Sequence, residues 1–231
     1  MNIQLVSVVL PVYNQADHIQ NVLEEYIHGL RQFHLAYELL PVINGPRRDK
    51  SLEICRALEQ EFPCIRTFCI AEGGWGRAVR YGLSQAKGDL LCYTNTARTT
   101  AKELLLALVY GSVHPDSVIK ANRKIRSGLR RRLGSLLYNL ECRALFDLPY
   151  WDVNGTPKVF SRDLPELLKL SRNDDLIDLE FNVICHVENY PVIELPTFSS
   201  SRHSGKSTTT MRSAVRMYWN AYRFRQEFRA E

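Results

Sequence analysis

A polar turn at residues 95–98 combines side chains that could hold an anionic ligand. The stretch GDLLCYTNTARTT, residues 88–100, begins as an apolar run and ends in Asn95, Thr96, Ala97 and Arg98. Amide and hydroxyl oxygens bind a hard cation only weakly when no carboxylate charge supports them. The guanidinium of Arg98 carries a positive charge and a planar fork of donors that suits phosphate. The turn therefore favours an anion held by arginine, although Arg98 could also be an ordinary solvated turn residue.

Two further stretches are rich in cations. Residues 120–143 contain eight basic residues against one Glu, and more arginines follow between residues 202 and 229. In a chain with a net charge of +5, this uneven distribution indicates an anionic partner. We do not expect nucleic acid, because the interleaved pattern LGSLLYNL is typical of a core-facing helix and no nucleic-acid-binding module is visible.

The first half of the chain alternates short apolar runs with amphipathic stretches. Strands are predicted at 4–13, 37–44, 65–70, 89–95 and 116–122, and helices at 16–33, 49–62, 75–86 and 101–112. This order predicts an α/β fold, a Rossmann-like and mostly parallel sheet with helices on both faces.

Sheets of this kind bind ligands at the carboxyl ends of their strands. Glycines before a helix allow tight turns and leave helix amides free for anions, although by itself such a cluster is more often an ordinary turn. The residues at these ends that we expect to line a site are Pro11, Tyr13, Asn14, Gln15, Asn44, Gly45, Gly74, Trp75, Gly76, Arg77, Asn95 and Thr96.

The second half is less regular. It predicts a basic helix at about 128–147, a helix near 175–188, an edge strand at 190–196 and a polar Ser/Thr-rich loop before residue 211. We expect one domain over residues 1–210 and a basic amphipathic helix over 211–231. That helix suits an anionic membrane surface, but it could equally dock on the protein's own core or on a partner.

Composition limits the class of protein. The chain has 231 residues, of which 45% are hydrophobic, enough for a packed core. Its apolar runs are too short to span a membrane and its start does not resemble a secretion signal, so we expect a cytoplasmic protein, peripheral at the inner face of the membrane if the last helix binds lipid. The six cysteines have no C-x-x-C spacing, which favours small buried side chains over zinc or disulfides.

Four segments in order resemble the family 2 glycosyltransferases, and most closely their polyprenyl-phosphate branch, which includes dolichol-phosphate mannose synthase. The segments are VSVVLPVYNQADHIQNVLEEY, AEGGWGRAVRYGLSQAKGDLL, DVNGTPKVFSR and SRHSGKS, and the resemblance covers roughly residues 5–210. It implies the GT-A fold and transfer of a sugar, with inversion, from a nucleotide-diphosphate donor to a lipid phosphate. The strand-end residues above would bind the donor. The acceptor would contact Arg123, Arg131, Ser135, Asn154 and Lys158.

The departures from the family bear on the mechanism. Ile43 and Asn44 stand where the family has paired aspartates, Gln15 replaces a Glu, and Asn95, Thr96 and Ala97 replace the metal-binding Asp-x-Asp. We therefore expect no required metal, with a weak Mg²⁺ or Mn²⁺ site left open. Negative charge grows on the departing diphosphate and must be balanced. The hypothesis is that Arg98 balances it, together with Arg202 and Lys206 of the polar loop.

The need for a base depends on the acceptor. A phosphate is ionised at neutral pH and needs none, whereas a sugar hydroxyl would, and Asp152 is then the first choice, followed by Asp178 or Glu180. Asp152 could equally organise its own turn. Two hypotheses remain: a glycosyltransferase that works without a carboxylate-bound metal, and an inactive homologue that binds a nucleotide sugar or lipid phosphate as a scaffold or regulator.

Overall fold

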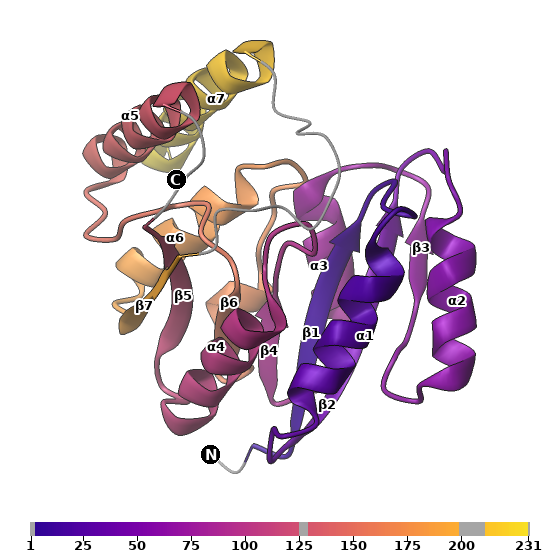
Figure 1. Ribbon diagram of the computed structural model, residues 1–231. Coiled ribbons are helices and arrows are strands. Elements are labelled where there is room, and N and C mark those ends of the chain that lie inside the picture. The colour runs from indigo at the N-terminus through magenta and orange to yellow at the C-terminus, as the bar shows by residue number, and fades with distance from the viewer. Residues whose placement is uncertain (1–2, 125–128, 199–210, 231) are drawn as a thin grey trace.

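A computed structural model describes residues 3–124, 129–198 and 211–230 and shows a seven-stranded sheet covered by helices (Figure 1). The strands are β1 (Leu5–Val12), β2 (Ala36–Asn44), β3 (Phe68–Ile70), β4 (Leu90–Tyr93), β5 (Val118–Arg123), β6 (Lys158–Ser161) and β7 (Val192–Thr197). The helices are α1 (Ile19–Leu30), α2 (Ser51–Glu61), α3 (Trp75–Gln85), α4 (Ala101–Val113), α5 (Leu129–Phe146), α6 (Ile177–Val187) and α7 (Met211–Ala230), with a short 3₁₀ helix, η1, at Pro165–Leu168.

The strand order β3-β2-β1-β4-β6-β5-β7 confirms the mostly parallel sheet. β1 pairs in parallel with β2 and β4, and β5 pairs in parallel with the edge strand β7. β6 is the exception, because it runs antiparallel to both β4 and β5. The predicted third strand is shorter than expected: residues 68–70 form β3, and Ile65 makes only an isolated bridge to Leu39.

Alternate residues of the strands pack against helices on opposite faces. Val8 of β1 belongs to a core with α1 and α4, whereas its neighbour Val9 belongs to a second core with α3 and α6. In α1 the buried residues recur every three to four positions, at Ile19, Val22, Leu23, Tyr26, Ile27 and Leu30. Each such side chain stabilises the fold by roughly 1.5–3 kcal/mol.

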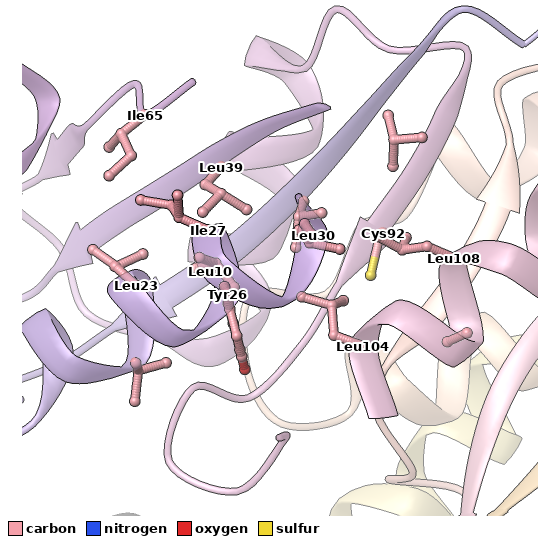
Figure 2. Close-up of a cluster of buried hydrophobic side chains, with 14 of the residues drawn as sticks. Leu10, Leu23, Tyr26, Ile27, Leu30, Leu39, Ile65, Cys92, Leu104 and Leu108 are labelled. Atoms are coloured by element: carbon pink, nitrogen blue, oxygen red, sulfur yellow. The ribbon is translucent and has the colours of Figure 1, made fainter. Parts of the chain in front are cut away.

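Tyr26 connects this core to the predicted site. Its ring lies among the leucines of α1 and α4 (Figure 2), and its hydroxyl donates a 2.8 Å hydrogen bond to the carbonyl of Thr99. Burial raises the pKa of Tyr26, so the hydroxyl keeps the proton that it donates. The turn after β4 is therefore held from beneath by the hydrophobic core.

A third cluster joins α5, α6 and α7. Phe146 of α5 contacts Phe224 and Phe228 of α7, and Leu179 and Val183 of α6 belong to the same cluster. One face of α7 therefore docks on the protein itself, and α5 and α7 lie side by side (Figure 1). No helix among the described residues is both long and apolar enough to cross a bilayer. Cys55, Cys92, Cys142 and Cys185 are buried as expected, but Cys69 is exposed.

Candidate functional site at the carboxyl ends of the strands

An amide at the end of β2 joins two neighbouring segments. Asn44 donates from Nδ2 to the carbonyl of Val12 at 2.9 Å and accepts at Oδ1 from the amide of Gly74 at 3.1 Å. An aspartate could accept the second hydrogen bond but could not donate the first. Gly45 has a φ of 78°, and a Cβ there would lie 3.2 Å from the Tyr13 ring. The ends of β1 and β2 and the glycine-rich segment thus meet.

The side-chain oxygens in the turn after β4 are hydrogen-bonded within the protein. Asn95 accepts at Oδ1 from the amide of Ala97 at 3.0 Å, and buried Thr96 donates from Oγ1 to Gln15 Oε1 at 2.6 Å. Arg98 is half-buried, and its amide donates to the Asn95 carbonyl at 3.1 Å. Over the described parts of the chain, no three His, Cys, Asp or Glu side chains gather to hold a metal. An amide, a hydroxyl and a methyl do not fit a divalent cation.

The loop after β1 is pinned to the start of α2. The Gln15 amide donates to Ser51 Oγ at 2.8 Å, and the Ala16 amide donates to Asp49 Oδ2 at 2.8 Å. Burial opposes ionisation of Asp49, but hydrogen bonds from Ala16 and Ser51 outweigh it and lower the pKa of Asp49. Asn14, at φ 49°, accepts from the Arg48 amide at 3.2 Å. The predicted donor-side loop is therefore held in one conformation by specific contacts.

The glycine-rich segment packs closely against the backbone of residues 172–174. Cβ atoms at Gly74 and Gly76 would each lie 2.5 Å from a backbone oxygen of residues 172–173. The Arg77 amide in the first turn of α3 donates to the Asn173 carbonyl at 3.0 Å, and its guanidinium pairs with Glu72. The amides of Gly74 and Arg77 are thus bonded within the protein, and the glycines leave room for the 172–174 backbone.

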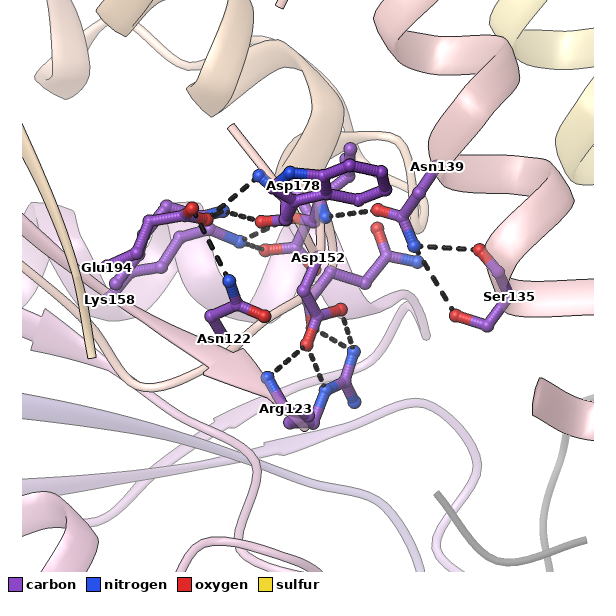
Figure 3. A network of polar contacts seen from close by, with 12 residues as sticks. Asn122, Arg123, Ser135, Asn139, Asp152, Lys158, Asp178 and Glu194 are labelled. Carbon is purple, nitrogen blue, oxygen red and sulfur yellow. Dashed lines mark hydrogen bonds and ion pairs between the residues drawn. The ribbon is translucent and has the colours of Figure 1, made fainter. Parts of the chain in front are cut away.

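An arginine and an aspartate form the centre of the predicted acceptor side (Figure 3). Arg123 donates from Nε and Nη2 to the two oxygens of Asp152, both at 2.7 Å, and its amide donates to Asp152 Oδ2 at 2.9 Å. Nη2 also donates to the Asn154 carbonyl at 2.8 Å. Burial lowers the pKa of Arg123, but Asp152 outweighs this effect and raises it. The carboxylate therefore orients the guanidinium.

A second ion pair lies deeper. Lys158 is fully buried, donates to Asp178 Oδ1 and gives a 3.1 Å hydrogen bond to the Val153 carbonyl. Asp178 also accepts from Trp75 Nε1 at 3.1 Å and from the Tyr93 hydroxyl at 3.0 Å. Burial lowers the pKa of Lys158, and Asp178 opposes that shift. The Lys158 ammonium is therefore bonded to buried groups of the protein and is not exposed to a ligand. This differs from the expected contact with an acceptor phosphate.

A third pair completes the network. Buried Lys120 donates to Glu194 Oε1 at 3.0 Å and to the Trp151 carbonyl, and the Trp151 amide donates to the same Glu194 oxygen at 2.9 Å. Asn139 of α5 accepts from the Val153 amide at 2.7 Å and donates to the Ser135 carbonyl at 2.7 Å. The three cations thus face three carboxylates, as burial of charge requires.

The structure brings most of the predicted residues together. Of the acceptor set, Arg123, Ser135, Asn154 and Lys158 belong to or adjoin this network, and Trp75 connects it to the donor set. Arg202, Lys206 and the side chain of Arg131 lie outside what the structure describes. Sequence reasoning missed Lys120, Asn139 and Glu194. The available signal was a lysine inside the apolar strand SVIKAN.

Glu180 and Asp178, the reserve bases, are both engaged. Glu180 accepts from the Ser171 amide at 2.9 Å, from the Ser171 hydroxyl at 2.5 Å and from the Arg172 amide at 3.0 Å. Asp178 accepts from Lys158, Trp75 and Tyr93. Together with Asp152, all three predicted base candidates act as hydrogen-bond acceptors that fix the surrounding structure.

Relatives of known name are similar to this chain in sequence. Two undecaprenyl-phosphate 4-deoxy-4-formamido-L-arabinose transferases are similar. That of Pseudomonas paraeruginosa (strain DSM 24068 / PA7) is 27% identical over 173 residues, 74% of this chain and 51% of that protein. That of Sodalis glossinidius is 23% identical over 224 residues, 95% of this chain and 67% of that protein. The chain spans about half the length of the first of these relatives.

Solved structures support the fold. Glucosyl-3-phosphoglycerate synthase from Mycobacterium tuberculosis, in complex with Mn²⁺, UDP and glucosyl-3-phosphoglycerate, superimposes with a TM-score of 0.71 and 16% identity over 96% of this chain and 80% of that one. This identity speaks for the fold alone. The model of the family described as "Glycosyl transferase family 2" matches residues 7–160, and the chain therefore belongs to that family.

Proposed function

We propose that this protein transfers a sugar from a nucleotide-diphosphate donor to a polyprenyl phosphate lipid. The donor would bind where the ends of β1, β2 and β4 meet, the edge at which sheets of this type hold ligands. The names of the relatives, undecaprenyl-phosphate transferases, support the acceptor class. The proposal extends those names to a chain that matches only part of each relative.

The acceptor assignment rests on one observation: the carboxylates near the site already accept hydrogen bonds or ion pairs within the protein. Asp152 is held by Arg123, Asp178 by Lys158, and Glu180 by the Ser171 and Arg172 amides. A carboxylate that already accepts several hydrogen bonds is a poor base, because taking a proton would break them. An acceptor hydroxyl would lack a base, whereas a phosphate needs none. A phosphate also suits Arg123, whose Nη1 donates no hydrogen bond to any residue in the described ranges.

Guanidinium groups would balance the departing diphosphate. Asn95, Thr96 and Ala97 offer no carboxylate to a metal, while Arg98 follows at the same strand end. A unit charge about 4 Å from another contributes on the order of 4 kcal/mol at an effective dielectric near 20, a factor of several hundred to a thousand in rate. Arg202 and Lys206, in the segment that the structure does not describe, are proposed to assist.

One observation favours a second candidate function. The oxygens of Asn95 and Thr96 are engaged within the protein, and no three His, Cys, Asp or Glu side chains of the described residues gather in their place. A homologue that binds a nucleotide sugar or a lipid phosphate without turnover would have the same features. Binding and turnover must therefore be measured separately.

The test is transfer of radiolabelled sugar from UDP- and GDP-sugars to a short-chain polyprenyl phosphate, with and without EDTA. We expect transfer that the chelator leaves within about twofold, and a loss of a hundredfold or more in Arg98→Ala, since one charge is removed. Arg56→Ala is the matched control, because this exposed arginine pairs with Glu59 on α2, away from the site. Its activity should equal that of the wild type.

Three results would argue against the proposal. Abolition by EDTA with rescue only by divalent cations would exclude arginine as the charge carrier. Unchanged activity in Arg98→Ala would do the same. A donor-induced rise in melting temperature without any transfer would support the non-catalytic homologue.

A further inference from the structure

The outer face of α5 carries a row of exposed leucines. Leu133, Leu136, Leu137 and Leu140 follow the i, i+3, i+4, i+7 spacing of one helical face, and they are 50%, 45%, 57% and 46% exposed. The opposite face of the same helix buries Tyr138, Cys142 and Phe146. An exposed apolar patch of this kind indicates a site of interaction with a membrane, another protein or a ligand.

α7 packs beside α5 and exposes aromatic rings of its own. The Tyr218 hydroxyl donates to the Gly134 carbonyl at 2.6 Å, and the Phe224 ring lies 5.2 Å from that of Phe146, so the two helices run in the same direction. On α7 the exposed side chains include Trp219, 61% exposed, and Tyr222, 45% exposed, whose rings are 5.9 Å apart. Trp and Tyr are the side chains that prefer the boundary between lipid and water.

The charged side chains of the two helices are mostly positive. Residues 129–146 and 211–230 contain nine arginines and two glutamates, a net charge of +7, which leaves −2 for the rest of a chain whose total is +5. Arg216 and Arg223, both exposed, lie on α7 near Trp219 and Tyr222 in sequence. A surface that combines leucines, aromatic rings and arginines is complementary to anionic lipid.

We propose that the outer faces of α5 and α7 form a docking surface for an anionic lipid bilayer, with the leucines of α5 as its apolar part. The inference rests on the proposed function in one respect, namely that a lipid-linked acceptor is presented at a membrane. A second copy of the chain is a poorer occupant, because symmetric pairing would bring these arginines against their own copies.

α5 also gives the docked surface a route to the site. Leu136 and Leu137 follow Ser135 directly, and Ser135 is joined through Asn139 to the Val153 amide in the buried network. One helix therefore carries the exposed leucines on one side and, on the other, Asn139, which is bonded to the Val153 amide next to Asp152. A phosphate at the headgroup level would approach the site along this helix.

The experiment is sedimentation of the full chain with vesicles in the absence of nucleotide sugar and acceptor lipid. One set of vesicles is phosphatidylcholine with phosphatidylglycerol, and the other is phosphatidylcholine alone. We expect binding to the anionic vesicles that weakens with salt, and a reduction of about tenfold or more in Leu136→Gln/Leu137→Gln. Arg216→Gln/Arg223→Gln should weaken binding to anionic vesicles only.

The matched control is Leu106→Gln/Val113→Gln, which alters two side chains of α4 that are 44% and 64% exposed. It should bind like the wild type, and all variants should keep the wild-type melting temperature. Equal binding by the α5 variant would overturn the proposal. So would a wild-type dimer that the α5 substitutions dissociate, which would identify a second copy as the occupant.

Different results would exclude the docking surface and the catalytic proposal. Transfer to a water-soluble short-chain acceptor tests catalysis without a membrane. Normal transfer without vesicle binding would remove the docking surface alone. Vesicle binding that depends on Leu136 and Leu137, without any transfer, would remove the catalytic proposal alone.

Discussion

Thr96 Oγ1 donates a 2.6 Å hydrogen bond to Gln15 Oε1 and so joins the turn after β4 to the loop after β1. The bond needs a hydroxyl donor and an oxygen acceptor, and it forms with Thr96 fully buried. Two carboxylates at these positions would repel one another unless a cation lay between them. The pair therefore keeps the two strand ends together without a metal.

Restoring carboxylates beside this bond should create a metal response. We predict that Mn²⁺ leaves the melting temperature of the wild type unchanged, because amide and hydroxyl oxygens hold it weakly. Asn95→Asp/Ala97→Asp should show a rise that depends on Mn²⁺ concentration, as expected for binding to the folded state. Differential scanning fluorimetry with Mn²⁺ and with EDTA checks this. A Mn²⁺-dependent rise in the wild type would contradict it.

Asp152→Asn should separate a positioning role from a catalytic one. Asp152 has φ 49°, a conformation that asparagine tolerates well, so the change tests charge more than backbone. Without the carboxylate, Arg123 loses its orienting partner. We predict a higher KM for the lipid phosphate, a kcat within about tenfold, and a stability loss of roughly 2–4 kcal/mol.

A base at Asp152 would give a different result. The variant would then lose kcat by about a hundredfold or more, and the acidic limb of the pH–rate profile would disappear. Steady-state kinetics across pH with a soluble acceptor distinguish the two outcomes. Arg123→Lys is the companion variant. An ammonium cannot form the bidentate pair with Asp152, so this variant should also have a higher KM for the lipid phosphate.

The order of elements in the first half could be predicted from the sequence because each strand and helix carries its own periodicity. β6 could not, since it has only four residues, follows Pro157 and runs against its neighbours. That the proposed donor-side residues lie near one another could be predicted, because strand ends converge in any parallel sheet. Their hydrogen-bond partners were not predictable from pattern alone.

The buried network shows why. Lys158 and Asp178 are 20 residues apart, and Lys120 and Glu194 are 74 apart, so nothing local in the sequence pairs them. A lysine is usually a surface residue. These two are buried because their strands, β5 and β6, each lie between two other strands of the sheet. The packing of the glycine-rich segment was unpredictable for the same reason, because the 172–174 backbone that lies against it comes from a distant part of the chain.

Gly76→Ala tests that packing role against a control in the same protein. A Cβ at Gly76 would lie 2.5 Å from the Arg172 carbonyl oxygen and 2.6 Å from that of Asp174, whereas nothing lies within 4 Å of a Cβ at Gly134. We predict that Gly76→Ala destabilises the fold by roughly 1–3 kcal/mol. Gly134→Ala should be neutral or stabilise by up to about 1 kcal/mol, because alanine is the better helix former. Urea unfolding measures both, and equal effects would contradict the packing role.

Glu38 should make stability depend on acid pH from a position remote from the site. Burial opposes its ionisation, but hydrogen bonds from Ser7 and the Lys87 amide, together with Arg66, outweigh it and lower the pKa of Glu38 below its ordinary 4.5. A lowered folded-state pKa stabilises the protein fully above pH about 4.5 and loses that contribution as pH falls through the folded-state value. Glu38→Gln should therefore cost about 2 kcal/mol at neutral pH, and the difference from wild type should shrink under acid conditions. Glu24→Gln, at an exposed residue bonded to Gln20, is the control and should change stability by less than about 0.5 kcal/mol at either pH. Urea unfolding at neutral and acid pH measures these differences, and a Glu38→Gln difference that stays constant across that range would show that the carboxylate is not the source of the dependence.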